Sequence, residues 1–388
     1  MDILIAGHCD LTALQPYLSE GTENLPPGVA AVPVRNLVTA LLDRGHQVTL
    51  VTLDPRVNEE VEANGERLRI RVGRSRAAKR ARDFFRLERE YISRAISMER
   101  PDVVHAQWTY EYALGALAAK RAPTLVTVHD WGPAILRFHP HPFRAVRLLM
   151  QLETLRRRPY LTTVSPCMQR RLKALVRGEE VHLVPNGIRD DLFNAGEGEQ
   201  HKGSEPPLIV AVNEGWSSYK NVSSLLRAFP SVLKRVRDAR LVLIGREYGR
   251  GETAEVWAAS EGLTKGVEFL GQLPNTDVIA WIRNADVFAH PAREESFGLV
   301  LVEAMASRTA VVGGARSGGV PWVLDYGLAG LLCDVRRPEH LSAQLLLLIE
   351  QSDKRKHFAQ RGYTRAHLNF RMSTVADQYL ALYERFAT

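Results

Sequence analysis

The segment His290-Pro-Ala-Arg-Glu-Glu-Ser-Phe-Gly-Leu-Val-Leu-Val-Glu-Ala-Met-Ala306 joins the end of an apolar strand, a polar loop and the start of a helix. We expect the strand to end at the first of these residues and the helix to begin near Gly298. The free N–H groups of a first helical turn form an anion site, and a glycine lets a ligand approach the backbone closely. Glu295 and Glu303 add carboxylates that can bind sugar hydroxyls at both ends of a diphosphate. In the alternative interpretation, these are surface acids and Ser296 caps the helix.

Short β-rich runs alternate with helical patterns on both sides of this segment, which predicts an α/β protein built from parallel βαβ units. The predicted strands are Asp2–Gly7, Gln47–Leu53, Arg67–Val72, Val103–Gln107, Thr124–His129, Leu161–Ser165, Val181–Pro185, Leu208–Val212, Leu241–Gly245, Val267–Leu270, Val287–His290 and Ala310–Gly313. The predicted helices are Val29–Arg44, Arg82–Met98, Val222–Arg237, Ala254–Gly262, Val278–Asn284, Leu299–Ala306 and the last stretch, Met372–Phe386.

A Gly-, Pro- and Glu-rich stretch, Asn194–Pro207, interrupts this alternation and is typical of a linker. The sequence therefore predicts two doubly wound, Rossmann-like domains, with residues 1–195 in the first and 205–370 in the second. The amphipathic stretch 371–388 has no strand after it and can pack on either domain, the N-terminal one included.

The net charge of +7 is concentrated in two segments, Arg67–Arg94 and Arg137–Arg177. A basic face can meet nucleic acid, an anionic membrane or a phosphorylated substrate, or it can simply be solvated. No apolar window is long enough to span a membrane, and the N-terminus lacks the pattern of a signal peptide. Cys9, Cys167 and Cys333 are far apart, as in a reduced compartment, so we expect a cytoplasmic protein.

The opening segment resembles the Glu-x7-Glu motif of the retaining glycosyltransferases of family 4, which have the GT-B fold. Seven residues fall in register with that motif: Glu295, Phe297, Gly298, Glu303, Ala304, Met305 and Ala306. The resemblance implies that Glu295 contacts the donor sugar at the catalytic centre and that Glu303 contacts the ribose. It also places Phe297, Gly298 and Leu299 in the donor site, and it implies two domains facing across a cleft.

Further segments are similar to the same family along nearly the whole chain. Ser317-Gly-Gly-Val-Pro321 resembles the family's glycine loop, which implies that Gly318 and Gly319 lie near the active site. Pro26-Pro-Gly28 stands where the family has its N-terminal glycine loop. His129 in Thr-Val-His-Asp resembles the family's cleft histidine, expected to orient the sugar or the acceptor. Val184–Ile188 resembles the segment that leads into the linker.

Lys220 resembles the family's lysine that neutralises the donor diphosphate, and a compact ammonium suits that task. The sequence departs from the family five residues earlier, where Gly215 replaces an arginine. Either one phosphate cation is missing, or Arg246 or Arg293 replaces it. Trp322 also stands where the family often has a glutamate.

The resemblance implies transfer of a hexosyl unit from a nucleoside-diphosphate sugar, most simply a UDP- or GDP-sugar, to an acceptor hydroxyl with retention of configuration. The acceptor can be a glycan, a lipid-linked molecule or a small molecule. His129, His139 and His141 have no carboxylate or cysteine that completes a ligand set, so we expect no metal and no cofactor. A GT-B epimerase and a catalytically silent binding homologue stay open as alternatives. No nucleic-acid-binding module is recognised.

The basic segment Pro142–Arg158 has helical periodicity, with apolar residues near one face and arginines beside them. A basic amphipathic helix can rest on an anionic membrane, and the family often acts on lipid-linked acceptors at the cytoplasmic leaflet. In the alternative interpretation, Leu149, Leu152 and Leu155 pack on the sheet and the arginines are solvated.

Overall fold

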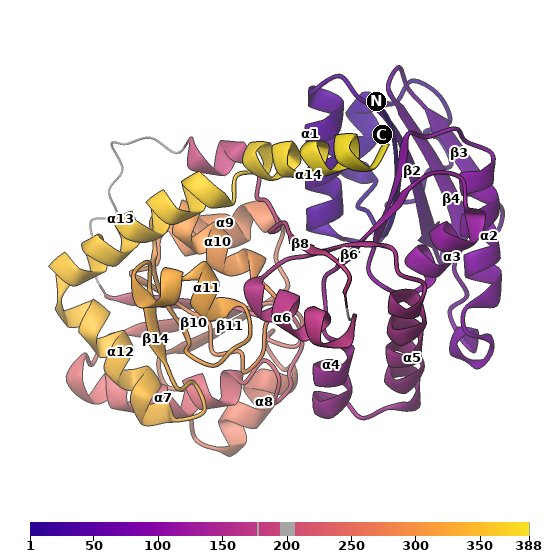
Figure 1. Cartoon of the computed structure of the whole chain (residues 1–388). Helices are drawn as coiled ribbons and strands as arrows, with labels where there is room; N and C mark the ends of the chain where they lie inside the picture. The colour runs from indigo at the N-terminus through magenta and orange to yellow at the C-terminus, as the bar shows by residue number, and fades with distance from the viewer. Residues whose placement is uncertain (177, 195–205, 388) are drawn as a thin grey trace. The chain divides into compact units, whose positions relative to one another are not determined.

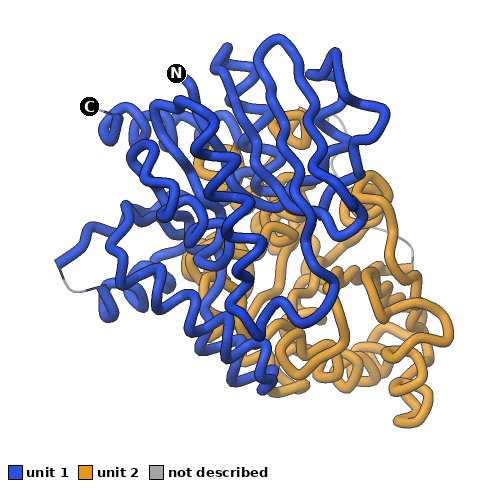
Figure 2. Tube along the Cα trace, turned by 90° about the vertical axis from the view of Figure 1, so that its right-hand side faces the viewer, with its two compact units in different colours: residues 1–187, 372–388 blue, residues 188–371 orange. Residues whose placement is uncertain are grey.

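The computed structural model describes residues 1–176, 178–194 and 206–387, and the chain forms two compact α/β units (Figure 1). Unit 1 comprises Met1–Gly187 and Met372–Thr388, and unit 2 comprises Ile188–Arg371. Figure 2 colours unit 1 blue and unit 2 orange. The two sheets, parallel except for one edge strand, and their covering helices confirm the predicted fold class. Most of the expected linker lies outside the described residues.

Unit 1 contains an eight-stranded sheet in the order β3-β4-β2-β1-β5-β6-β7-β8. Its strands are β1 (Asp2–Ala6), β2 (Gln47–Asp54), β3 (Val61–Asn64), β4 (Leu68–Arg74), β5 (Val103–Gln107), β6 (Thr124–Val128), β7 (Tyr160–Thr163) and β8 (Val181–Leu183). Its helices are α1 (Val32–Asp43), α2 (Arg86–Ser97), α3 (Glu111–Ala119), α4 (Gly132–Phe138), α5 (Pro142–Arg156), α6 (Pro166–Leu175) and α14 (Met372–Ala387), with short 3-10 helices at Thr12–Tyr17 and Arg80–Asp83. All strand pairs are parallel except β3 with β4.

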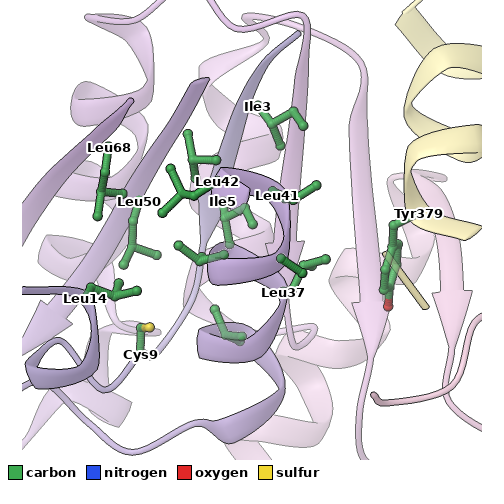
Figure 3. Close-up of a cluster of buried hydrophobic side chains, with 14 of the residues drawn as sticks. Ile3, Ile5, Cys9, Leu14, Leu37, Leu41, Leu42, Leu50, Leu68 and Tyr379 are labelled. Atoms are coloured by element: carbon green, nitrogen blue, oxygen red, sulfur yellow. The ribbon is translucent and has the colours of Figure 1, made fainter. Parts of the chain in front are cut away.

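Helix α14 belongs to unit 1 although it is the last element of the chain. It packs against α1 and β5, and its Tyr379 and Tyr383 are buried in the same cluster as Ile3 and Leu37. Figure 3 shows Tyr379 reaching from the yellow C-terminal helix, with Ile3 on β1 and Leu37 on α1. The last amphipathic stretch therefore completes the N-terminal core.

Unit 2 contains a six-stranded sheet in the order β11-β10-β9-β12-β13-β14, in which every strand pair is parallel. Its strands are β9 (Leu208–Val212), β10 (Arg240–Ile244), β11 (Val267–Gly271), β12 (Val287–Ala289), β13 (Ala310–Gly314) and β14 (Leu331–Cys333). Its helices are α7 (Val222–Arg235), α8 (Thr253–Ser260), α9 (Asn275–Arg283), α10 (Leu299–Ala306), α11 (Val320–Val323), α12 (Pro338–Glu350) and α13 (Ser352–Asn369), with 3-10 helices at Asp190–Phe193 and Asp325–Gly327.

The strand order of unit 2 reverses between β9 and β12. From β9 the chain adds β10 and β11 on one side, and β12, β13 and β14 on the other. In open parallel sheets, ligands bind beyond the carboxyl ends of the strands at such a reversal. The loops that follow β9 and β12 therefore occupy the position where a binding site is expected.

His105 is a fully buried histidine in the centre of the unit 1 sheet, on β5. Its Nδ1 lies 2.6 Å from the hydroxyl of Tyr383 on α14, and its Nε2 lies 2.6 Å from Thr127 Oγ1 on β6. Burial, with a smaller contribution from His129, lowers the pKa of His105 to about 3. The imidazole is therefore neutral in the folded protein at pH 5, where it is protonated in the unfolded chain.

We predict that His105 makes unit 1 less stable as pH falls. The unfolded chain binds a proton with a pKa of about 6.5, so the stabilisation is complete above that pH and is lost progressively as pH falls toward about 3. At pH 5 the loss is about 2 kcal/mol relative to pH 8. Denaturant unfolding of wild type and His105→Gln at pH 5 to 8 measures it, because both share all other titrating groups. Equal pH dependence in the two proteins would contradict the prediction.

Candidate active site

Two loops of unit 2 meet at the strand-order reversal and bring Lys220 to Glu295. Lys220 lies between β9 and α7, and Glu295 lies between β12 and α10. Because β9 and β12 are paired and parallel, both loops leave the same edge of the sheet. The Lys220 Nζ lies 3.0 Å from Glu295 Oε2, and the two side chains are 20% and 19% exposed. This pair forms the centre of the candidate donor site.

The Glu295 carboxylate is held in its charged form. Burial alone would raise its pKa, but the Lys220 ammonium and the neighbouring His290 outweigh burial and lower the pKa to about 2. His290 is 2% exposed, and its Nε2 lies 3.7 Å from Glu295 Oε2. Glu295 is therefore ionised at neutral pH, and it offers acceptor oxygens only.

Asn221 fixes the loop that carries Lys220 to the loop that carries Glu295. Its Nδ2 donates to the carbonyl of Pro291 at 2.9 Å and to that of Val335 at 2.8 Å. The backbone N–H of Arg293 also donates to the carbonyl of Tyr219 at 2.9 Å. The side-chain amide of Asn221 thus binds backbone that is far away in the sequence. The positions of Lys220 and Glu295 therefore depend on each other.

The glycine loop lies directly on the backbone of Glu295. The N–H of Gly319 donates to the Glu295 carbonyl at 2.7 Å, and Ser317 Oγ donates to the Ala292 carbonyl at 2.6 Å. Gly318 has a φ of +61°, and a Cβ there would lie 2.3 Å from the Glu295 carbonyl oxygen. A side chain at Gly318 would therefore push the two loops apart. The structure thus brings the predicted glycine loop to the predicted donor site.

Helix α10 begins directly after the Glu295 loop, with Gly298 as its N-cap. Gly298 has a φ of +93°, which favours glycine, and no side chain caps the helix. The alternative in which Ser296 caps the helix is therefore wrong. Among the described residues no side chain caps this helix, so its first-turn N–H groups suit an anion.

The remaining predicted donor residues lie on or beside α10. Glu303 is 8% exposed, and its Oε1 accepts from Asn275 Nδ2 at 3.4 Å. Phe297 is buried, and its ring packs edge-on against Phe370 with centroids 5.3 Å apart. The Phe297 side chain therefore anchors the loop in an aromatic cluster. Leu299 opens the helix and is half-buried.

Arg246 occupies the space beside Gly215. A Cβ at Gly215 would lie 3.2 Å from Arg246 Nη2 and 3.2 Å from Glu247 Oε2. Arg246 Nε donates to Glu214 Oε1 at 2.6 Å, and the arginine side chain is 57% exposed. The Arg246 guanidinium thus lies where the side chain of an arginine at position 215 would begin. The carboxylates of Glu214 and Glu247 both contact this guanidinium. Arg293 is fixed through its backbone to Tyr219.

His129 lies in unit 1, directly after β6 and half-buried. Its Nε2 lies 2.6 Å from Gln107 Oε1, and its ring centroid lies 4.8 Å from that of Trp108. Burial lowers the pKa of His129 to about 3, so the ring is neutral at physiological pH. Gly28 has a φ of +78° and makes an isolated bridge with Asp10, close to the segment after β1.

Two family models match the chain: "Glycosyltransferase Family 4" matches residues 30–192, and "Glycosyl transferases group 1" matches residues 197–365. Together they account for most of both units. The chain belongs to the family 4 glycosyltransferases.

Curated relatives of this glycosyltransferase include the phosphatidyl-myo-inositol mannosyltransferase of Mycolicibacterium smegmatis, 27% identical over 92% of this chain and 90% of the relative. The N-acetyl-alpha-D-glucosaminyl L-malate synthase of Bacillus anthracis is 25% identical over 74% of this chain and 75% of its own.

Solved structures with the same fold include sucrose-phosphate synthase from Thermosynechococcus elongatus, with a TM-score of 0.76 and 19% identity over 99% of this chain and 98% of that one. Anabaena HepE in complex with UDP has a TM-score of 0.70 and 18% identity over 99% of this chain and 100% of that one. These neighbours confirm the GT-B fold of the glycosyltransferase.

Sequence reasoning missed three residues of these sites: Asn221, His290 and Gln107. The amide of Asn221 bridges positions that are far away in sequence, and no spacing indicates this. His290 was expected only as the end of a strand. Gln107 did carry a signal, because polar residues at the ends of adjacent parallel strands lie close together.

We predict that Lys220 carries much of the affinity for the diphosphate. Lys220→Ala should weaken binding of a free nucleoside diphosphate by roughly tenfold or more, the value of one charge-assisted contact. Isothermal titration calorimetry measures this, with Lys234→Ala as the control, because Lys234 is an exposed lysine on α7. Unchanged affinity in Lys220→Ala would remove the lysine from the site. The same titration of Arg246→Ala and Arg293→Ala determines which arginine assists it.

Proposed function

We propose that this glycosyltransferase moves a hexosyl unit from a nucleoside-diphosphate sugar to an acceptor hydroxyl with retention of anomeric configuration. In this proposal unit 2 holds the donor, a UDP- or GDP-sugar, and unit 1 holds the acceptor. The observation that carries the proposal is the Lys220–Glu295 pair beside the uncapped start of α10. That arrangement offers one cation, Lys220, and N–H donors to a diphosphate, next to a carboxylate for sugar hydroxyls.

The chemistry requires charge stabilisation at the leaving group. As the anomeric bond breaks, positive charge grows on the sugar ring and negative charge grows on the departing diphosphate. Preorganised donors stabilise that negative charge without having to reorganise. Lys220 and the first-turn N–H groups after Gly298 would do this, while Glu295 would hold the sugar and Glu303 the ribose. His129 would orient the sugar or the acceptor.

The names of curated relatives support hexosyl transfer, because they include a mannosyltransferase and an N-acetylglucosaminyl malate synthase. An epimerase would act on the nucleotide sugar without any acceptor, and a silent homologue would bind it without turnover. Assays with and without acceptor separate all three.

No divalent metal takes part in the proposal, and the described residues contain no group of three potential metal ligands. Activity that vanished in excess chelator and returned with magnesium or manganese would contradict that part.

We predict that Glu295→Gln and Glu303→Gln abolish most transfer while each variant melts within a few degrees of wild type. Each change keeps the shape of the side chain and removes the negative charge. Release of nucleoside diphosphate measures turnover, and the coupling constant of the product's anomeric proton reports retention. Glu339→Gln is the matched control, because Glu339 is an exposed carboxylate of unit 2. Normal turnover in both site variants would refute the donor-site assignment.

We further propose that α5 places unit 1 on an anionic membrane surface, at the inner face of the cytoplasmic membrane. The alternative interpretation, in which Leu149, Leu152 and Leu155 all pack on the sheet, holds only for Leu155, which is buried. Leu149 is 51% exposed and Leu152 is 42% exposed. Arg156 and Arg157 lie exposed beside them and share one carboxylate, that of Glu153. None of the described helices is long and apolar enough to cross a bilayer.

We predict that the protein sediments with vesicles that contain anionic lipid and that added salt releases it. Each basic residue near such a surface contributes about 1 kcal/mol, and salt screens the attraction. Replacing Arg156, Arg157 and Arg158 by glutamine, or Leu149 and Leu152 by serine, should weaken binding. Leu87→Ser is the control, because Leu87 is an equally exposed leucine on α2. A protein that stays in the supernatant with anionic vesicles at low salt would contradict this proposal.

A further inference from the structure

Strand β5 carries two buried polar side chains, His105 and Gln107, in the centre of the unit 1 sheet. His105 is 0% exposed and Gln107 is 2% exposed. The two are separated by one residue, so their side chains lie on the same face of the strand. Burying polar groups destabilises a core unless each one finds hydrogen-bond partners. The partners found here connect the candidate site of unit 1 with the last helix of the chain.

A continuous row of hydrogen bonds runs from His129 to α14. His129 Nε2 lies 2.6 Å from Gln107 Oε1, and Gln107 Nε2 lies 3.0 Å from His105 Nε2. His105 Nδ1 lies 2.6 Å from the hydroxyl of Tyr383. Tyr383 is 0% exposed, so the row ends inside the core that α14 completes.

The amide oxygen of Gln107 defines the role of His129 in this row. This oxygen only accepts, so the proton of the neutral His129 ring lies on Nε2. The amide nitrogen of Gln107 only donates and lies near both ring nitrogens of His105, 3.0 Å from Nε2 and 3.3 Å from Nδ1, while Thr127 Oγ1 lies 2.6 Å from the same Nε2. Burial lowers the pKa of both histidines to about 3, which agrees with neutral rings.

The consequence at the site concerns His129 Nδ1. With the proton on Nε2, Nδ1 carries a lone pair and can only accept a hydrogen bond. Among the described residues, the structure gives His129 no hydrogen bond other than the one to Gln107, and the residue is half-buried. The Trp108 ring, 4.8 Å away between centroids, restricts the plane of the imidazole. Nδ1 is therefore available to a substrate hydroxyl.

We propose that Gln107 is a positioning residue that holds His129 as its Nε2–H tautomer, so that Nδ1 accepts a hydrogen bond from a substrate hydroxyl. The inference deepens the proposed function, because it gives His129 the role of a hydrogen-bond acceptor. Tyr383 extends the row to α14, because its hydroxyl lies 2.6 Å from His105 Nδ1.

The tautomer can be measured in the free protein, without any donor sugar. Two-bond ¹H–¹⁵N correlation spectra of histidine-labelled protein distinguish a protonated ring nitrogen from a bare one, and loss of the signal in His129→Asn assigns it. We expect protonated Nε2 and bare Nδ1 in wild type. Bare Nε2 in His129 overturns the proposal, whether or not the protein turns over a nucleotide sugar. Absence of turnover with the expected tautomer refutes the proposed function only.

Variants separate positioning from general stability. Gln107→Met removes both hydrogen bonds at similar side-chain length, so the tautomers should mix and kcat should fall by roughly tenfold, while KM for the donor changes less than twofold. Gln107→Glu keeps an acceptor for His129 Nε2–H and should retain the tautomer and most of kcat.

Thr162→Val is the matched control within the same buried region. It breaks the 2.6 Å contact between Thr162 and Thr127 without touching Gln107 or His129. We expect it to lower the melting temperature while the His129 tautomer and kcat stay as in wild type. Wild-type tautomer and kcat in Gln107→Met, or equal loss of kcat in Gln107→Met and Thr162→Val, would overturn the proposal. If Gln107→Met does not fold, wild type and Gln107→Glu still decide it.

Discussion

The ion pair between Lys220 and Glu295 is the interaction on which the candidate donor site depends. Two charges that are about four-fifths buried are tolerated because each neutralises the other at 3.0 Å. Removing either partner leaves an uncompensated charge in a poorly solvated place. In the proposed function a diphosphate would bring new negative charge to the same lysine, so donor binding would have to share or replace the Glu295 contact. The ion pair thus keeps both side chains in the candidate site.

Hydrogen bonds between the neighbouring loops hold that pair in place. Asn221 connects the Lys220 loop to the carbonyls of Pro291 and Val335, and the glycine loop donates to the carbonyl of Glu295. The candidate site of unit 1 is built differently, from neutral groups. His129, Gln107 and His105 form hydrogen bonds without any formal charge. This division suits a reaction in which charge develops at the leaving diphosphate while a neutral hydroxyl attacks.

Much of the fold could be predicted from the sequence, because buried parallel strands are continuous apolar runs. Leu208–Val212 is such a run, and it was predicted with the bounds that the structure shows. Val103–Gln107 was also predicted with its observed bounds, although it carries the polar His105 and Gln107. Strand β3 (Val61–Asn64) was missed because an antiparallel edge strand with few apolar residues has a weak pattern. Strand β14 (Leu331–Cys333) was missed because three residues are too short to show periodicity.

The site could be predicted only in part. The motif indicated Glu295 and Lys220 separately, but the two are 75 positions apart, and nothing in their spacing gives the order of the strands that bring them together. The direction in which the apolar face of a helix points also depends on tertiary packing. The periodicity of α5 was clear, yet only the packed structure shows that Leu149 and Leu152 lie outside the core.

A thermal-shift screen against nucleoside-diphosphate sugars tests the central claim most directly. A ligand that binds only the folded state stabilises it by about 2.7 kcal/mol at one hundred times its Kd, a rise of several degrees in melting temperature. We predict such a rise for at least one UDP- or GDP-sugar, and a smaller rise for the corresponding sugar 1-phosphate, which lacks the nucleotide. Failure of every nucleoside-diphosphate sugar to raise the melting temperature at millimolar concentration would contradict a donor site in unit 2.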